Sequence, residues 1–295
     1  MKLTFTRISS LALFTALAVS CSRDEQVAPD QQPIAATVNQ DATRDSHLAM
    51  GNPSGAVTDA TNSPNNYLMS KTQYALSYSR DKGKPNWVSW HLSSAWLGST
   101  ARQDNFASDA TLPSSWFHAT SSSYTGSGFD RGHNCPSADR TGSVADNSAT
   151  FLMTNMMPQA ANNNQQTWAG LENYERTLVS QGKELYVICG SYGSGGTGVN
   201  GYATTIASGK ITVPARCWKV VVVLSEGSSD ASRVTTATRI IAIDTPNTTS
   251  ISSSWGSYRT TVDAIEQATG YNILSAVNST VQAAIESKVD TGPTS

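Results

Sequence analysis

The sequence predicts an α+β fold with a largely antiparallel central sheet flanked by helices. Segments rich in strand-forming residues occur in clusters and do not alternate regularly with helical segments, which argues against a purely parallel sheet. The strongest helical pattern appears only after residue 160. Neither an internal repeat nor a second linker follows the N-terminal region. We therefore predict one folded domain over residues 46–295.

Residues 1–20 predict an export signal, because two basic residues precede a short apolar run that cannot span a bilayer. Cys21 follows directly, as in a bacterial lipobox, and predicts lipidation at that residue; the alternative is a secretory signal cleaved near Ala18. The polar residues 21–45 predict a flexible tether. The expected location is the bacterial cell envelope or the outside of the cell, with membrane contact only through the lipid anchor.

The first strand candidates, residues 74–78 and 87–92, are separated by the polar, glycine-containing segment 80–85, which predicts a hairpin. Residues 129–134 and 150–156 are two shorter strand candidates.

Three apolar, β-branched segments predict strands that are buried on both faces. They cover residues 185–189, 218–224 and 239–243. Cys189 and Cys217 would lie in two strands that could pair, so a disulfide between them is considered, with Cys135 left as a free thiol.

Helices are fewer. Residues 164–181 place apolar side chains at helical spacing, and Gly182 provides the end of this helix. A second helix is expected over 261–269, ended by Gly270, and a capping box that begins at Ser279 opens a third.

The net charge of the chain limits the classes of function it can have. The formal net charge is −2, and removal of the two positive charges of the signal would leave −4. This argues against a tight nucleic-acid binder, which needs a basic face, but not against an enzyme that needs positive charge only at one phosphate. The sequence has neither GxSxG nor HExxH, and its glycine-rich segment 190–196 lacks the Lys-Ser/Thr of a phosphate loop.

One stretch of the chain carries the residue types that phosphodiester cleavage needs. His133 is suited to activate water, Arg131 to bind phosphate, and Asn164 and Glu172 to offer oxygen ligands to a hard cation. Asn164 and Glu172 are eight residues apart and can lie toward one side of a helix. The residues alone do not establish that His133 and Asn164 meet.

This stretch resembles the DNA/RNA non-specific endonuclease family over about residues 48–289. The resemblance rests on four motifs in the family's order: DRGH at 130–133, TNMMPQ at 154–159, NQxxW at 164–168 and LE at 171–172. It implies a ββα-metal (His-Me) finger within the sheet-based fold.

The resemblance implies a role for each matching residue. His133 matches the general base, Asn164 the direct protein ligand of one Mg²⁺ or Mn²⁺ ion, and Glu172 the acid that contacts this ion through water. Arg102 and Arg131 match arginines that face the phosphate.

Three further positions belong to the same motifs. Asn155 matches an asparagine placed with the catalytic residues, and Asp130 is expected to order the finger. Cys135 is a departure from the family pattern and could make the protein sensitive to thiol reagents.

The resulting hypothesis is a metal-dependent, sugar-non-specific endonuclease that cuts single- or double-stranded DNA and RNA and leaves 5′-phosphates. The alternatives are a catalytically silent surface lipoprotein that binds nucleic acid, and a secreted phosphodiesterase for small substrates. The sequence identifies neither the biological purpose, the oligomeric state nor a protein inhibitor. His47, His91 and His118 are expected to have no catalytic role.

Overall fold

The structure is a computed structural model that describes residues 45–295. The predicted signal, Cys21 and nearly all of the predicted tether therefore lie outside the described residues. Within residues 45–295 we find no helix that combines the length and the apolar character needed to cross a membrane.

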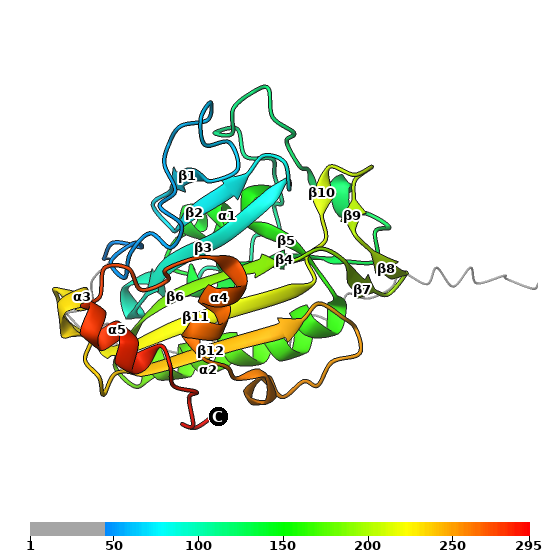
Figure 1. Cartoon of the computed structure of the whole chain (residues 1–295). Helices are drawn as coiled ribbons and strands as arrows, with labels where there is room; N and C mark the ends of the chain where they lie inside the picture. The colour runs from blue at the N-terminus through cyan, green and yellow to red at the C-terminus, as the bar shows by residue number, and fades with distance from the viewer. Residues whose placement is uncertain (1–44) are drawn as a thin grey trace, which may run out of the picture. The chain divides into compact units, whose positions relative to one another are not determined.

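A six-stranded, fully antiparallel sheet forms the centre of the described chain (Figure 1). In spatial order its strands are β1 (Tyr67–Ser70), β2 (Ala75–Ser79), β3 (Lys84–Leu92), β6 (Lys183–Tyr192), β11 (Arg216–Ser225) and β12 (Arg239–Pro246). The predicted hairpin is β2–β3, and the three segments predicted as buried strands are the cores of β6, β11 and β12. The predicted fold class is confirmed.

The DRGH segment forms a separate two-stranded unit that packs beside the sheet. Its strand β4 (Asp130–His133) pairs antiparallel with β5 (Met156–Gln159). The predicted strand at 150–156 is wrong except for its last residue, because Thr150 caps α1 (Val144–Ala149) and the residues that follow turn through a short 3-10 helix before β5 begins.

The predicted helix after β5 begins with one π-helical segment, Asn163–Trp168, and continues as α2 (Ala169–Ser180). It ends before Gly182, which adopts the positive φ of 78° that a glycine tolerates best. Strands β4 and β5 followed by this helix give the expected ββα arrangement.

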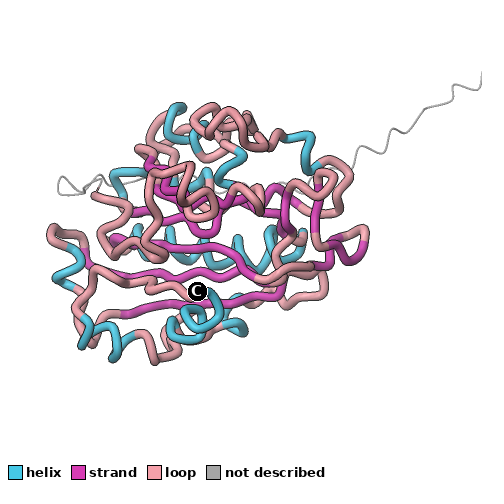
Figure 2. Tube along the Cα trace, turned by 45° about the horizontal axis from the view of Figure 1, so that its top comes forward, coloured by secondary structure: helices cyan, strands magenta, loops and turns pink. Residues whose placement is uncertain are grey.

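Helices cover both faces of the sheet (Figures 1 and 2). Leu171 and Leu178 of α2 are buried in one apolar cluster with β3 and β6. Helices α4 (Val262–Thr269) and α5 (Ser279–Ile285) contribute Val262, Ile265 and Ile285 to a different cluster on the other face. The two helical layers are thus separated by the sheet.

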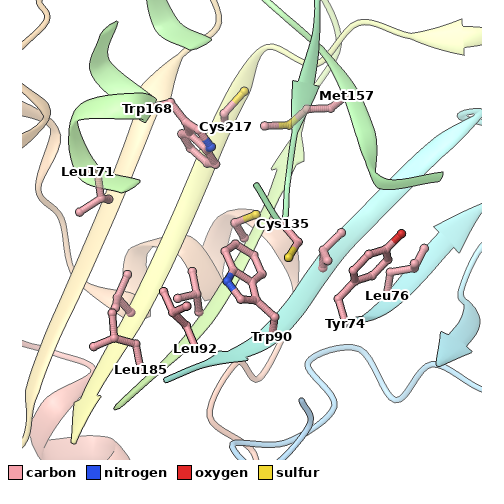
Figure 3. Packing of buried hydrophobic residues seen from close by; sticks show 14 of the residues in the cluster. Tyr74, Leu76, Trp90, Leu92, Cys135, Met157, Trp168, Leu171, Leu185 and Cys217 are labelled. Carbon is pink, nitrogen blue, oxygen red and sulfur yellow. The ribbon is translucent and has the colours of Figure 1, made fainter. Parts of the chain in front are cut away.

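The cluster on the α2 face also fixes the ββα unit to the sheet. Figure 3 shows Cys135 and Met157 of that unit together with Trp168, with Trp90 of β3 and with Cys217 of β11. All five side chains are at least 98% buried. Burial of two tryptophans and their neighbours stabilises this junction by several kcal/mol, at ~25 cal/mol per Å² of apolar surface.

The remaining elements are short. They are β7 (Gly196–Gly198), β8 (Gly201–Ala203), β9 (Thr205–Ile206), β10 (Ile211–Thr212) and α3 (Asp230–Arg233). Strands β7 and β8 form one small hairpin, and β9 and β10 form another. The glycine-rich segment 190–196 contains the end of β6, a turn and the first residue of β7.

The caps of α4 agree with the sequence prediction, whereas the N-cap of α5 differs from it by one residue. Thr261 caps α4, accepting a hydrogen bond from the Ala264 amide at 3.1 Å, and Gly270 ends it with a φ of 75°. The cap of α5 is Asn278, whose side chain accepts from the amides of Thr280 and Val281, and not the predicted Ser279. An asparagine one position earlier satisfies the same free amides.

The considered disulfide between Cys189 and Cys217 is wrong, because all three cysteines of the described chain are free and buried. In the β6–β11 pairing, Cys189 lies opposite Lys219 and Cys217 lies opposite Ser191. The two residues are therefore diagonal neighbours, with Cα atoms roughly 7–8 Å apart, beyond the usual Cα separation across a disulfide.

Candidate active site

His133 is the last residue of β4, and its ring is enclosed by aromatic side chains. The ring centroid lies 5.6 Å from that of Phe106 and 5.0 Å from that of Phe151. The Nε2 atom is buried and has no hydrogen-bond partner in the described protein. A buried nitrogen without a partner is costly unless a ligand or water uses it, so this atom is a candidate contact for substrate or attacking water.

The surroundings of His133 keep it neutral. Burial, and then the positive charges of Arg102 and Arg131, lower its pKa from 6.5 to about 3. Its remaining hydrogen bond is to the backbone of Arg131. Because Nε2 is unpaired, that bond uses Nδ1, and Nε2 is left with the lone pair that accepts a proton.

The two predicted phosphate-binding arginines lie beside the same aromatic rings. The Arg102 guanidinium is 4.8 Å from the Phe151 ring centroid, and that of Arg131 is 4.2 Å from the Phe106 centroid. Arg102 also donates to Asp104 at 2.7 Å and to Ser137 at 3.1 Å, with about half of its side chain exposed. The rings hold both cations near His133, and Arg102 keeps exposed surface for an anion.

Asn164 is tied to the strand that carries His133. Its Nδ2 donates to Oδ2 of Asp130 at 2.9 Å, and Gln165 donates to the same oxygen. This bond fixes the amide through its nitrogen and leaves its oxygen as an atom that could bind a hard cation such as Mg²⁺ or Mn²⁺. Asp130 and His133 are three residues apart on β4, or ~10 Å. Asp130 therefore orders the ββα unit by joining its strand to its helix.

Glu172 lies on α2 with 13% of its side chain exposed. Its Oε1 is 3.7 Å from Nζ of Lys219, which projects from the central strand β11 and is fully buried. Burial raises the pKa of the Glu172 carboxyl, although Lys219 opposes this change. The positive charge of Arg102 also acts on Glu172, as it does on His133. The carboxylate is available for an outer-sphere contact with a cation.

Lys219 belongs to a buried charged cluster that the sequence analysis missed. Its Nζ lies 3.4 Å from Oε1 of Glu175 and 4.5 Å from the Trp168 ring centroid. On the same helix, Arg176 donates to Asp139 at 2.8 Å. The sequence did contain a signal, because Lys219 is the one charge inside an otherwise apolar strand candidate. Through Lys219, this cluster places a positive charge beside the Glu172 carboxyl.

Asn155, which was expected among the catalytic residues, binds backbone groups with its side chain. Its side chain is fully buried, its oxygen accepts from the Cys135 amide at 3.0 Å, and its nitrogen donates to the carbonyls of Cys135 and Thr150, each at 2.8 Å. Its polar atoms are therefore occupied. Asn155 is a positioning residue that fixes the chain directly after His133.

Cys135 is unsuited to reaction with thiol reagents. It is fully buried, and burial raises the pKa of its thiol to about 12. A buried, protonated thiol is a poor nucleophile, so the expected sensitivity to thiol reagents is not supported. Cys135 instead packs in the apolar junction of Figure 3.

The site therefore gathers residues from four parts of the chain. Contacts link Arg102 and Arg131 to His133 through two aromatic rings, and Asn164 to the His133 strand through Asp130. Glu172 follows on the same helix. His91 is buried against Glu184, and His118 bonds to a backbone carbonyl, so neither takes part in this arrangement.

The chain is similar to several known proteins. The profile of the DNA/RNA non-specific endonuclease family matches residues 52–280. A nuclease from Nostoc sp. is 49% identical over 280 residues, which cover 95% of this chain and 97% of that protein. Human mitochondrial endonuclease G is 30% identical over 54% of this chain and 56% of its own length. Among solved structures, that of an EndoG/EndoGI complex aligns with a TM-score of 0.62 at 22% identity, covering 79% of this chain and 91% of the other.

Proposed function

The chain belongs to the DNA/RNA non-specific endonuclease family of metal-dependent nucleases, and from this membership we propose that it cleaves DNA and RNA with His133 as general base and Asn164 as the protein ligand of one Mg²⁺ or Mn²⁺ ion. The observation that carries the proposal is the neutral, unpaired Nε2 of His133 between two arginines. Single- and double-stranded substrates are expected alike, since the proposed contacts are to the phosphate and not to a base.

In the proposed reaction, Nε2 of His133 takes a proton from the attacking water, while the bond from Nδ1 to the backbone of Arg131 holds the ring in the productive tautomer. Arg102 and Arg131 bind the phosphate oxygens and stabilise the charge that develops there. Cleavage on the side that leaves 5′-phosphates is part of the proposal.

The ion would be held by the Asn164 oxygen, and Glu172 would contact it through water. When bound, the ion would neutralise phosphate charge and stabilise the leaving oxygen. Asp130 orients Asn164 for this task, and the Lys219 ammonium opposes the effect of burial on the Glu172 carboxyl.

The experiment compares the purified protein with a His133→Ala variant on plasmid DNA and on RNA, with Mg²⁺ or Mn²⁺ and with EDTA. We expect metal-dependent cutting of both polymers, and a loss of kcat of at least about 10²-fold in His133→Ala, with substrate binding largely kept. His118→Ala is the matched control and should cut normally. Near-normal turnover of His133→Ala would exclude the base assignment, and retention of nucleic acid without cutting would favour the silent binding protein.

The proposal also includes export, with lipidation at Cys21 as the anchor. The signal-like pattern of residues 1–20 and the cysteine directly after it support this location. In a bacterial host, the wild-type chain should fractionate with membranes and Cys21→Ser should become soluble. If both remain in the same fraction, the lipid anchor is wrong and a cleaved secretory signal is favoured.

A further inference from the structure

Three carboxyl groups converge where helices α4 and α5 meet, away from the residues described above. Asp263 lies in the first turn of α4, Glu266 lies one turn later, and Glu286 directly follows α5. One carboxylate oxygen from each lies within 4.8 Å of the others. Such a cluster is common at protein surfaces, so it needs an independent sign that it binds something.

Glu286 provides that sign. Only 5% of this residue is exposed, and its Oε1, which is buried, has no hydrogen-bond partner in the described chain. Its backbone carbonyl accepts from the Asp263 amide at 3.1 Å, and this bond holds the end of α5 against the start of α4. A buried carboxylate that lies beside two other carboxyls and has an oxygen without a donor is costly.

The charges that act on this group are all negative. Burial, and then Glu266 and Asp263, raise the pKa of Glu286 to about 7. Burial and Asp263 also raise the pKa of Glu266, whose carboxylate accepts a hydrogen bond from the Ile273 amide at 2.6 Å. The cluster therefore has a deficit of positive charge.

We propose that Asp263, Glu266 and Glu286 form a second divalent-cation site, suited to Ca²⁺, that joins α4 to α5. The donor set consists of oxygen atoms only, which hard cations prefer. Ca²⁺ fits better than Mg²⁺ because it accepts irregular arrangements of six to eight oxygens, whereas Mg²⁺ needs a near-ideal octahedron. Asp263 is exposed and gives the ion a path to the buried Glu286.

This site is independent of the proposed catalytic ion. Helices α4 and α5 cover one face of the sheet and α2 covers the other, as Figure 1 shows. The second ion would therefore stabilise the fold without a role in cleavage. Its effect should appear in thermal stability and not in the reaction rate.

The test uses the full chain carrying Asn164→Ala, so that the proposed catalytic ion does not contribute. After EDTA treatment, CaCl₂ is titrated while the melting temperature is measured. At about 100 times the dissociation constant, Ca²⁺ should raise the melting temperature by about 5–10 °C. Adding Glu286→Gln should abolish this rise and, because it removes a buried charge, should increase the melting temperature in EDTA.

Asp263→Asn, at an exposed position, should fold normally and shift the Ca²⁺ response to higher concentrations. Asp81→Asn removes the same charge from an exposed residue elsewhere and should keep the full response. A melting temperature that is insensitive to Ca²⁺ would overturn the proposal, since a proton on Glu286 would then suffice. So would a Ca²⁺ response that survives Glu286→Gln.

Discussion

At His133 the protein sets the protonation state by burial and by two arginines that are themselves held by aromatic rings. Phe106 and Phe151 contact both the imidazole and the guanidinium groups, so one small cage fixes ring position and charge together. DRGH predicted the histidine and one arginine. It could not predict that Phe106 and Phe151 would contact the histidine, because they lie in other segments of the chain and no sequence pattern links them to it.

Removal of one cation from this cage should change the pKa of the histidine in a known direction. In Arg102→Met the imidazolium is no longer repelled by the guanidinium, so the pKa of His133 should rise from about 3 toward 6.5. The measurement is an NMR titration of the ring protons. Arg80→Met, which removes an exposed arginine paired with Asp81, is the control. An unchanged or lower pKa in Arg102→Met would contradict the electrostatic account.

At the scale of elements, the sequence predicted best where one pattern determines one structure. Helical periodicity followed by a glycine predicted α2 and α4, and apolar β-branched runs predicted β6, β11 and β12. Prediction failed at residues 150–155, where side-chain bonds from Asn155 and Thr150 outweigh local strand propensity. The sequence also could not show that the buried lysine of β11 would face two glutamates of α2.

Mutations in the Lys219 cluster should have unequal effects on stability: loss of Lys219 should cost much more than neutralisation of Glu175. The pKa of Lys219 is raised, because Glu175 and Glu172 outweigh the effect of burial at the high pH where Lys219 would titrate and both carboxyls are ionised. Burial, with help from Asp139 and Glu172, raises the pKa of Glu175 to about 8, so this residue is protonated at neutral pH. Lys219→Met should therefore lower the free energy of unfolding by about 3–5 kcal/mol, because Glu172 loses its partner.

Glu175→Gln should change that free energy by less than about 1 kcal/mol, since it replaces one neutral group with another. Urea unfolding at pH 7 measures both variants. Equal losses in the two would mean that Glu175 is ionised and is the true partner of Lys219.

For the whole molecule, the sequence predicted the class of the fold but not its topology. Neither periodicity nor turn residues indicate that β3 pairs with β6, about a hundred residues later, because a pairing between distant strands depends on the complete packing. The assignment of apolar residues to the two cores, one on each face of the sheet, depends on that topology and could not be predicted without it.

Stability should have a plateau between about pH 4.5 and 6.5 in EDTA and fall on both sides. Between about pH 6.5 and 7 the folded state holds protons on Glu175 and Glu286, with pKa values of about 8 and 7, that the unfolded chain releases, so stability falls as pH rises. Above pH 7 the fall levels off, because burial lowers the pKa of Lys84 to about 7 and the unfolded chain then binds a proton that the folded chain has lost. Below pH 4.5 the unfolded chain carries protonated histidines, whereas burial keeps His47 and His133 neutral, with pKa values of about 4 and 3, so stability falls as pH falls.

Between these limits the two effects have opposite signs and offset each other. Each unmatched proton contributes ~1.4 kcal/mol per pH unit. The free energy of unfolding at pH 4, 5.5 and 7 is the measurement, and a steady increase from pH 5.5 to 7 would refute the assignment of the two glutamates.

The apolar junction in Figure 3 limits how the nuclease motif could be grafted onto another protein scaffold. Cys135, Met157 and Trp168 belong to the nuclease motif, yet they are covered by Trp90 and Cys217 of the central sheet. The motif therefore has no interior of its own, and a recipient scaffold would have to supply a matching apolar wall before the histidine and the asparagine could face each other. The four short sequence motifs therefore cannot adopt the active geometry without the sheet that packs against them.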